Sequence, residues 1–368
     1  MRFEFSSAGR IVFGPGTIEE LPAIAAGWSR RAFVVTGRDK IRHAGVIADL
    51  EAAGFHCSLF GIPREPDLAL VREGVAALRA AASGVVIAIG GGSAIDAGKA
   101  IAAIAANPGD VLDYLEVIGK GQALEQTPIP FIAVPTTAGT GSEVTRNAVL
   151  GSAEHGVKAS LRSPLMLARV AIVDPGLTMG LPREITVSSG LDALTQLIEP
   201  FVCNRANPMV DAICRDGLRV AARCLPRVCA DGRDAEARAG MSYASLLGGL
   251  ALSNAGLGVV HGFAAPIGGM FPAPHGAICA ALLRHGMAAN VRALRTRAPD
   301  SEALIRYEEI DRILGGMEWV NVPGLRELGV TEASLPEIAA KAERASSMKA
   351  NPVVLTRDEL IATLAAAL

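Results

Sequence analysis

Val85-Val-Ile-Ala-Ile-Gly-Gly-Gly-Ser-Ala-Ile-Asp-Ala-Gly-Lys-Ala100 joins a short apolar run to an amphipathic run through three glycines and a serine. The β-branched part predicts a strand, and the part from Ala94 onward predicts a helix. Glycines let the backbone approach an anion closely, and the free N–H groups at a helix start favour a pyrophosphate. The segment is neither a Gly-x-Gly-x-x-Gly fingerprint nor a Walker loop. Taken alone, it also fits an ordinary strand-to-helix turn, and both interpretations stay open at this point.

The same alternation continues on both sides of this segment through the first half of the chain. Short β-branched runs that alternate with longer amphipathic stretches are typical of a parallel sheet covered by helices. The expected strands are 32–35, 56–60, 85–89, 131–134 and 170–173, and the expected helices are 42–53, 68–81 and 94–106. Residues 3–5 and 10–13, separated by Ser6-Ser-Ala-Gly9, predict an N-terminal hairpin.

The second half of the chain has a different pattern. From Arg183 onward, Ala and Leu recur at helical spacing and β-branched runs nearly vanish, which predicts a helical bundle. We therefore expect an α/β dinucleotide-binding domain over residues 1–178 and an all-helical metal and substrate domain over residues 179–368. The glycine-rich loops fall in the first domain and the ligand-like side chains in the second. We expect a site made from both to lie in the cleft between the domains.

Composition excludes several classes of function. Half of the 368 residues are hydrophobic, a fifth are charged, and the formal net charge is -2, so nothing attracts nucleic acid or an anionic membrane. The N-terminus lacks the apolar core of a secretion signal, and we expect a cytoplasmic protein. The six cysteines include no Cys-x-x-Cys pair, which predicts buried free thiols. No cysteine has a role in the predicted mechanism.

A second loop strengthens the nucleotide interpretation. Phe131-Ile-Ala-Val134 leads into Pro135-Thr-Thr-Ala-Gly-Thr-Gly-Ser-Glu-Val144. Hydroxyl groups in this loop can donate to phosphate or ribose oxygens, and its glycines keep it thin. The candidate donors are Thr136, Thr137, Thr140 and Ser142. Two such loops at strand ends of one sheet indicate a dinucleotide.

Four polar side chains stand out in the apolar second half. Asp192 and Gln196 are one helical turn apart, so their tips can converge on one point. His261 and His275 supply the imidazoles that a divalent transition metal favours. The set predicts a metal site in which Gln196 is anomalous, because a carboxamide offers only a neutral oxygen.

Taken together, these segments resemble the iron-containing (group III) alcohol dehydrogenase family over nearly the whole chain. The most specific matches are 90–99, 135–143, Gly190-Leu-Asp-Ala-Leu194, 261–268 and Pro274-His-Gly276. The resemblance implies a Rossmann-like domain followed by a helical domain, and an oxidoreductase that interconverts alcohols and carbonyl compounds with NAD or NADP. It implies iron or zinc held by Asp192, the residue at 196, His261 and His275, of which Asp192, His261 and His275 would be catalytic. It implies nucleotide contacts from Gly91, Gly92, Ser93, Asp96, Thr136, Thr137, Thr140, Ser142, Lys158 and Leu177.

Three positions depart from the family pattern. Gln196 stands where many members have a histidine ligand, and Ala265 stands where many have a histidine close to the nicotinamide. Gly37 stands where NAD-preferring members often place an aspartate. An aspartate would bind the ribose 2′-OH and repel a 2′-phosphate, whereas neighbouring Arg38 or Lys40 could pair with a phosphate. We expect NADP to be accepted, with solvated loop charges as the alternative.

The departures leave alternatives open for the mechanism. Three strong ligands suffice for a catalytic zinc or iron site, so we expect metal binding to survive. In the alternative, His261 or His275 is an acid or base in a metal-free carbonyl reductase similar to the maleylacetate reductases. A further alternative is a catalytically degenerate nucleotide-binding protein.

The expected substrate is a small alcohol, aldehyde or ketone. Residues 254–276 contain no Lys or Arg, so a small, weakly charged carbonyl compound fits better than an anion. Arg162 and Arg284 could still hold an anionic group from outside that segment. The resemblance also leads us to expect a homo-oligomer, such as a dimer.

Overall fold

The computed structural model describes residues 2–39 and 41–368, which form two compact units. The sheet unit comprises Ser6–Thr137 and Gly141–Met179. The helical unit comprises Gly180–Leu368, the short segment Ala138–Thr140 and an N-terminal segment that ends at Phe5. The main division therefore falls after Met179, and two short segments from the first half of the chain group with the helices.

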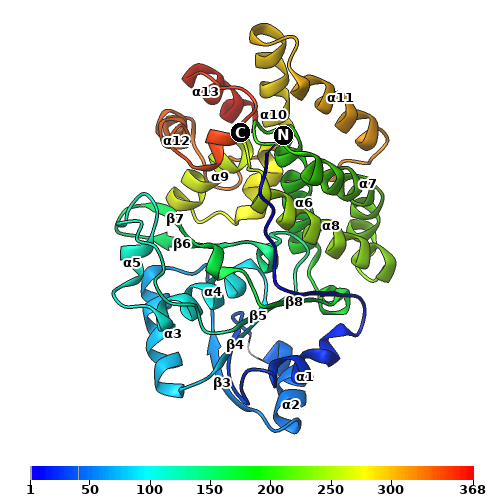
Figure 1. Ribbon diagram of the computed structural model, residues 1–368. Coiled ribbons are helices and arrows are strands. Elements are labelled where there is room, and N and C mark those ends of the chain that lie inside the picture. The colour runs from blue at the N-terminus through cyan, green and yellow to red at the C-terminus, as the bar shows by residue number, and fades with distance from the viewer. Residues whose placement is uncertain (1, 40) are drawn as a thin grey trace. The chain divides into compact units, whose positions relative to one another are not determined.

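The sheet unit is built on one parallel sheet, coloured blue to green in Figure 1. Its strands are β1 (Ile11–Phe13), β2 (Arg31–Thr36), β3 (His56–Gly61), β4 (Val85–Gly90), β5 (Phe131–Pro135) and β8 (Val170–Val173). Their order is β1-β8-β5-β4-β2-β3, and every neighbouring pair is parallel. The five strands expected from the β-branched runs are confirmed, and the fold class is the predicted one.

Helices cover both faces of this sheet, as the alternation of side chains along a strand requires. Val34, Ile87 and Ile132 share a buried core with α1 (Leu21–Ala25) and α2 (Ala44–Ala52). The other face carries α3 (Leu68–Ala81) and α4 (Gly92–Ala106). Helix α4 packs so closely that a Cβ at Gly98 would come within 2.9 Å of both Ala88 and Phe131. Glycine at this position sets the distance between α4 and the sheet.

The predicted N-terminal hairpin is wrong. Residues 3–5 form no strand, and Ile11–Phe13 instead pair in parallel with β8 at the edge of the sheet. Phe5 packs against the apolar core of the helical unit. An isolated two-stranded hairpin is only marginally stable in water, so joining an existing sheet and burying Phe5 stabilise the chain more.

An antiparallel hairpin that we did not predict follows the second glycine-rich loop. It consists of β6 (Asn147–Ser152) and β7 (Val157–Arg162), joined by a turn in which Gly156 has a φ of +59°. Ala148 and Leu150 are buried while Val149 between them is exposed, which is the period of two expected for a strand. The remaining short elements of this unit are η1 (Thr17–Glu20), η2 (Ile41–His43), α5 (Val111–Tyr114), η3 (Ser142–Val144), η4 (Pro164–Met166) and η5 (Pro175–Thr178).

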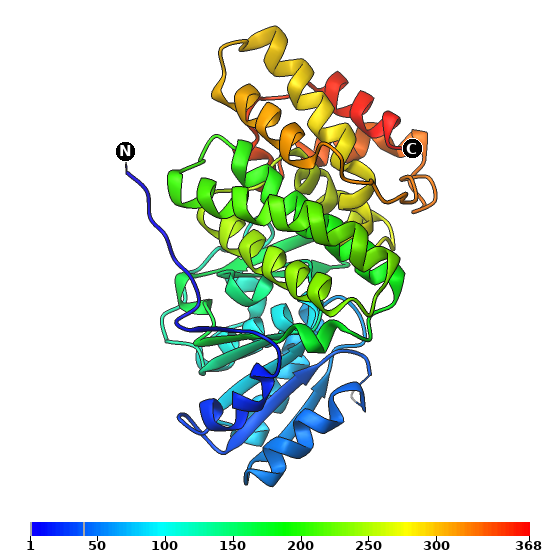
Figure 2. The ribbon, with the colours of Figure 1, turned by 90° about the vertical axis from the view of Figure 1, so that its right-hand side faces the viewer.

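The helical unit begins with three long helices that lie side by side, coloured green to yellow-green in Figure 2. They are α6 (Arg183–Val202), α7 (Pro208–Ala230) and α8 (Ala235–Asn254). Glycines allow the close packing, because a Cβ at Gly190 would come within 2.4 Å of Leu225 and one at Gly217 within 2.5 Å of Leu197. The unit continues with α9 (Val259–Met270), α10 (His275–Arg297), α11 (Glu302–Leu314), η6 (Glu332–Ser334), α12 (Leu335–Ala342), η7 (Ser347–Ala350) and α13 (Arg357–Ala366).

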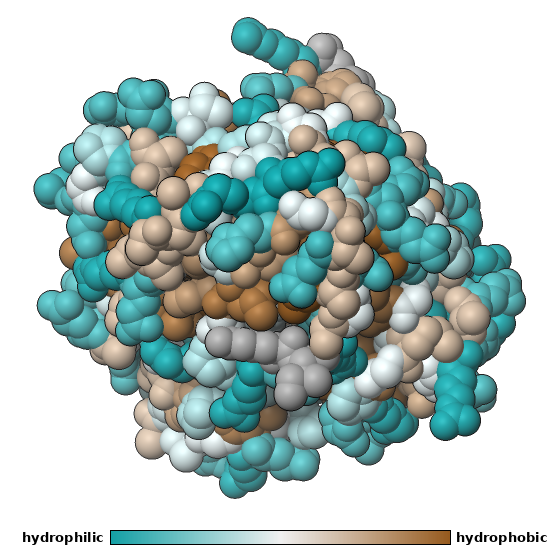
Figure 3. Space-filling view, turned by 90° about the horizontal axis from the view of Figure 1, so that it is seen from below, coloured by the Kyte–Doolittle hydropathy of each residue, from teal (hydrophilic) through white to brown (hydrophobic). Residues whose placement is uncertain are grey.

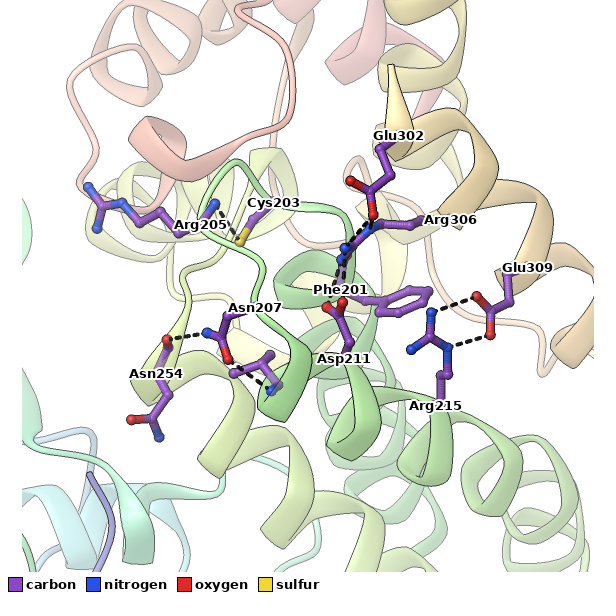
Figure 4. A network of polar contacts seen from close by, with 11 residues as sticks. Phe201, Cys203, Arg205, Asn207, Asp211, Arg215, Asn254, Glu302, Arg306 and Glu309 are labelled. Atoms are coloured by element: carbon purple, nitrogen blue, oxygen red, sulfur yellow. Dashed lines mark hydrogen bonds and ion pairs between the residues drawn. The ribbon is translucent and has the colours of Figure 1, made fainter. Parts of the chain in front are cut away.

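A network of ion pairs fixes the C-terminal end of α6 (Figure 4). Arg306 of α11 donates to Asp211 of α7 over 2.7 Å and 2.9 Å and to the carbonyl of Phe201 over 2.6 Å. Its neighbour Arg215 pairs with Glu309, and both guanidinium groups lie over the Phe201 ring. The network ties α6 to α7 and α11, and α6 carries the first candidate site residues.

Half of the residues are hydrophobic, and some of them are exposed at the surface. On the face seen in Figure 3, hydrophilic residues are spread around the rim and hydrophobic residues gather toward the middle. Among the residues that the structure describes, no single helix has the length and apolarity needed to cross a bilayer. Within this described part of the chain, α8 and α9 are the one pair that together reach that length and composition, with a bend of 95° between them.

Candidate active site

Helix α6 presents three polar side chains on one face. Asp192, Gln196 and Glu199 follow one another at spacings of four and three residues, and all three are buried. The amide nitrogen of Gln196 donates to Oδ2 of Asp192 over 3.1 Å. Oδ1 of Asp192 takes no part in this hydrogen bond. A Cβ at Gly248 of α8 would come within 3.2 Å of the Gln196 Cβ and 3.3 Å of the Ala193 carbonyl, so this glycine lets α8 approach α6 closely.

Glu199 fixes the position of His261 in α9. One carboxylate oxygen accepts from the backbone N–H of Val260 and the other contacts Nδ1 of His261, each over 2.7 Å. Because Glu199 occupies Nδ1, the Nε2 atom of His261 is the one free to act as a ligand. A Cβ at Gly258 would come within 2.9 Å of Oε1 of Glu199, so only glycine fits at the start of this helix.

The start of α10 contributes the other side chains. His275 is the first residue of the helix, and Cys279 follows one turn later with its Sγ atom 3.7 Å from Nε2 of His275. The His275 ring lies 5.4 Å from the His261 ring, measured between centroids. A Cβ at Gly276 would come within 2.7 Å of the carbonyl of Ser188, so this glycine lets α10 begin directly against α6.

Asp192, His261, His275 and Cys279 form one cluster, in which single ligand atoms all lie within 4.8 Å of one another. Oδ1 of Asp192 is 3.3 Å from Nε2 of His261 and 3.7 Å from Nε2 of His275. Metal–ligand bonds of roughly 2.0–2.3 Å in a tetrahedron give ligand separations of roughly 3.3–3.8 Å. The observed separations therefore match the edges of a zinc or iron coordination sphere.

Three buried polar atoms of this cluster have no hydrogen-bond partner within the described chain. They are Oδ1 of Asp192, Oε1 of Gln196 and Nε2 of His261. A buried polar atom without a partner is costly, and such atoms are rarely found together. Oδ1 of Asp192 and Nε2 of His261 lie 3.3 Å apart, and a divalent cation bound to both would satisfy the carboxylate and the imidazole at once.

The electrostatics of the cluster favour positive charge. Burial opposes ionisation of His261, but its contacts with Cys279, Asp192 and Glu199 raise its pKa well above the ordinary value of 6.5. Burial also opposes ionisation of Asp192, but the contacts with His261 and His275 hold its pKa below the ordinary value. The cluster thus stabilises a cation, either as a proton on an imidazole or as a metal ion.

His275 is more exposed than Asp192 and His261. The side chain of His275 is 35% exposed, whereas those of Asp192 and His261 are 2% and 6% exposed. Two of the candidate ligands are therefore held in the interior and the third borders solvent.

Sequence reasoning missed two residues of this arrangement. Glu199 lies seven residues after Asp192, on the same helical face, and Cys279 lies four residues after His275. Both spacings place the residue on the same helical face as a predicted ligand, so the sequence could have indicated both residues. The six cysteines are free, as expected, and all but Cys57 are buried. The prediction that no cysteine has a role in the mechanism did not anticipate the contact of Cys279 with His275, a candidate ligand.

The glycine-rich loops of the sheet unit lie next to each other. Strand β4 ends at Gly90 and α4 begins at Gly92, so the N–H groups of Gly92 and Ser93 have no acceptor within the helix. The backbone N–H of Thr136 donates to the carbonyl of Gly90 over 2.9 Å. A Cβ at Gly91 would come within 3.3 Å of the Thr137 hydroxyl. The structure thus brings Gly91, Gly92 and Ser93 together with Thr136 and Thr137.

Asp96 and Ser142 contact each other rather than remaining free. Oδ1 of Asp96 accepts from the Ser142 hydroxyl, and Oδ2 accepts from the backbone N–H of Val149 over 3.0 Å. The buried ammonium of Lys99 lies 3.3 Å from Asp96 and donates to the Ser142 carbonyl and the Thr145 hydroxyl over 2.9 Å each. These contacts hold the second loop against α4. Thr140 lies in the segment Ala138–Thr140, which groups with the helical unit.

The remaining nucleotide candidates lie in different surroundings. Gly37 follows β2, its backbone nitrogen lies 3.5 Å from the Cβ position of Gly90, and a Cβ at Gly37 would meet nothing within 4 Å. Arg38 is exposed, and Lys40 lies outside the described residues. Lys158 forms an ion pair with Glu65, while Leu177 packs against the sheet core. Of these, Gly37 is directly beside the phosphate-loop glycines.

Comparison with known proteins agrees with this architecture. Residues 8–175 match the model of the iron-containing alcohol dehydrogenases, and residues 186–368 match that of the C-terminal part of the same family. Alcohol dehydrogenase 4 of Saccharomyces cerevisiae is 33% identical, with 96% of this chain and 95% of the relative covered. The 1,3-propanediol dehydrogenase of Klebsiella pneumoniae is 35% identical, with 82% and 81% covered.

A solved structure of a 1,3-propanediol oxidoreductase has a TM-score of 0.90 and 32% identity, with 100% of both chains covered. The two family models together span nearly the whole chain. The chain belongs to the iron-containing alcohol dehydrogenase family.

Proposed function

We propose that this protein is a metal-assisted, NAD(P)-dependent oxidoreductase that interconverts a small alcohol and its aldehyde or ketone. The observation that carries the proposal is the cluster of Asp192, His261, His275 and Cys279, in which two oriented imidazoles and a buried carboxylate converge. The two glycine-rich loops of the sheet unit, which lie next to each other, supply a second, independent argument, because they suit the pyrophosphate of a dinucleotide.

The side chains of the helical unit prepare the site for catalysis. Asp192, His261 and His275 would hold a divalent ion, iron or zinc. When bound, this ion supplies Lewis-acid polarisation of the substrate oxygen, and the nicotinamide supplies or accepts the hydride. Glu199 keeps Nε2 of His261 directed at the cluster, and Gln196 keeps Asp192 in place through its amide N–H. The partial exposure of His275 leaves a side open for the substrate.

The sheet unit would bind the dinucleotide. The free N–H groups of Gly92 and Ser93, at the positive end of α4, suit the pyrophosphate. Open space at Gly37 and the absence of a carboxylate there leave room for a 2′-phosphate, to which exposed Arg38 could donate. NADP is therefore accepted alongside NAD in this proposal.

The substrate in this proposal is small and weakly charged. The two arginines that could hold an anionic group already have partners: Arg162 pairs with Glu116 over 2.9 Å, and Arg284 lies over the Trp319 ring at 5.4 Å. The K. pneumoniae relative is a dehydrogenase of 1,3-propanediol, a small uncharged alcohol. A short primary alcohol or diol and its aldehyde are the compounds to try first.

The test combines metal analysis with hydride transfer. The purified protein is dialysed against a chelator, its metal content is measured, and oxidation of short alcohols and reduction of their aldehydes are followed with both nicotinamide cofactors. Activity that disappears with the metal and returns when Zn²⁺ or Fe²⁺ is added supports the proposal. Full activity without metal would favour the maleylacetate-reductase type of mechanism. Tight NADPH binding without turnover across the panel would indicate a nucleotide-binding protein.

A further inference from the structure

We propose that Cys279 is a ligand of the metal ion, in place of the family's histidine at position 196, and that the resulting site selects zinc. This inference rests on the proposed function, because it concerns the same metal site. It assigns to Cys279 and Gln196 roles that differ from the family pattern.

The position of Cys279 is the first argument. Its Sγ atom is 3.7 Å from Nε2 of His275. The Sγ atom also lies within 4.8 Å of a ligand atom of each of Asp192, His261 and His275. A Zn–S bond of roughly 2.3 Å and a Zn–N bond of roughly 2.0 Å at a tetrahedral angle give a separation of about 3.5 Å. Cys279 is fully buried, so solvent does not compete with a metal ion for its thiol.

The orientation of Gln196 is the second argument. Its amide nitrogen donates to Oδ2 of Asp192 over 3.1 Å, so the carboxamide acts on the site through Asp192. Reversing the carboxamide would place its oxygen against a carboxylate oxygen, which is repulsive. A glutamine at 196 therefore orients Asp192 and leaves a coordination position to be filled, and Cys279 is the candidate donor beside it.

Charge and ligand type give the third argument. On binding, the Cys279 thiol loses its proton to bulk water and one sulfur–metal bond forms, without any redox change. The thiolate and the Asp192 carboxylate then balance the two charges of the ion, while both imidazoles remain neutral. Thiolate with imidazole is a ligand set typical of zinc, whereas oxygen and imidazole ligands alone also suit iron.

The test uses the full-length protein loaded with Co²⁺, a spectroscopic substitute for Zn²⁺. A thiolate ligand produces sulfur-to-cobalt charge-transfer absorption in the near ultraviolet, which imidazole and carboxylate ligands do not. We expect this band in the native protein and in Cys214→Ser, a control at another fully buried cysteine of the same unit. We expect Cys279→Ser to lose the band. Its Zn²⁺ affinity should fall by more than the roughly 10- to 100-fold that loss of an outer partner costs.

A second variant separates a lost ligand from a damaged fold. In Cys279→Ser/Gln196→His, the new imidazole occupies the family's ligand position. We expect Zn²⁺ affinity to recover while the charge-transfer band stays absent. A Co²⁺-loaded native protein without the band, or an unchanged Zn²⁺ affinity in Cys279→Ser, overturns the inference. Those results leave the proposed function standing if activity still depends on metal, whereas full activity without any metal defeats the proposed function itself.

Discussion

The two candidate binding regions differ in how the chain assembles them. The phosphate loop is one continuous segment in which a strand, three glycines and a helix follow directly, so its geometry is local. The candidate metal cluster draws on three helices, α6, α9 and α10, and Cys279 lies 87 positions after Asp192. A local motif can be recognised from its own residues, whereas a dispersed site depends on packing that brings distant turns together.

The largest effect is expected at the dispersed site. Asp192→Asn removes the buried carboxylate that faces both imidazoles. Lewis-acid catalysis contributes several kcal/mol, so we expect kcat/KM to fall by roughly a thousandfold together with the metal content. Steady-state kinetics and elemental analysis on the same preparation measure both quantities. His285→Ala, on α10 but outside the cluster, is the control and should keep both.

A matching loss of activity in Asp192→Asn with full metal content would contradict the role of Asp192 as a ligand. The variant would then have lost an acid or base rather than a metal site.

The next largest effect is expected at Glu199, which was not among the site residues implied by the family resemblance. Both of its oxygens accept, one from Val260 N–H and one from His261. Glutamine at this position has only one acceptor oxygen, so one donor would face the amide N–H₂. We expect Glu199→Gln to lower metal affinity by roughly 10- to 100-fold. A competition titration against a chelator measures this.

If Glu199 only supports the fold, Glu199→Gln would lower the thermal midpoint and leave the metal affinity of the folded protein unchanged. Glu309→Gln, which removes the partner of Arg215 in the ion-pair network around Phe201, is a control for a purely structural loss in the same unit.

These two regions also show what the sequence could and could not predict. The strands and α3 follow from β-branched runs and helical spacing, because β2, β4, β5 and β8 are almost wholly buried in the sheet and α3 buries one face. The N-terminal hairpin failed because Ile11–Phe13 pair with β8, a partner about 160 residues away that no local pattern identifies. Asp192, Gln196, His261 and His275 were predicted as a set, and the resemblance supplied their expected roles; the structure groups three of them, Asp192, His261 and His275, in one cluster. Cys279 was passed over because cysteine is so often an inert apolar residue.

A smaller effect is expected at the continuous loop. Gly37 lies beside Gly90 with open space at its Cβ position, so an aspartate fits without steric conflict. In Gly37→Asp the new carboxylate would bind the ribose 2′-OH and repel a 2′-phosphate. We expect the ratio of kcat/KM for NADH over NADPH to rise by about tenfold or more, which is about 1.4 kcal/mol.

Gly37→Asn is the matched variant, with the same shape and no charge, and should change the ratio much less. An unchanged ratio in Gly37→Asp would place the adenine ribose away from this loop. A native protein that already prefers NADH by more than about tenfold would contradict acceptance of NADP.

The smallest effect is expected at Glu143 in the second loop, where we expect a change in stability rather than in nucleotide binding. Glu143 belongs to the same motif as Ser142 but is fully buried, and burial raises its pKa from 4.5 to about 7, although Lys99 opposes this. Between pH 4.5 and about 7, Glu143 is therefore protonated in the folded state and ionised in the unfolded state. Stability falls as the pH rises from 4.5 toward 7, and the full cost is present above 7.

Glu143→Gln removes this titration while keeping the shape of the side chain. We expect its thermal midpoint to exceed that of the native protein by several degrees above pH 7, and the difference to shrink as the pH falls toward 5. Thermal unfolding across this pH range, with exposed Glu154→Gln as the control, measures the difference. A constant difference at all pH values would mean that Glu143 stays ionised beside Lys99. The second loop would then be held by an ion pair, and the glutamine variant would be destabilised by its loss, with Asp96 left as the ionised partner of Lys99.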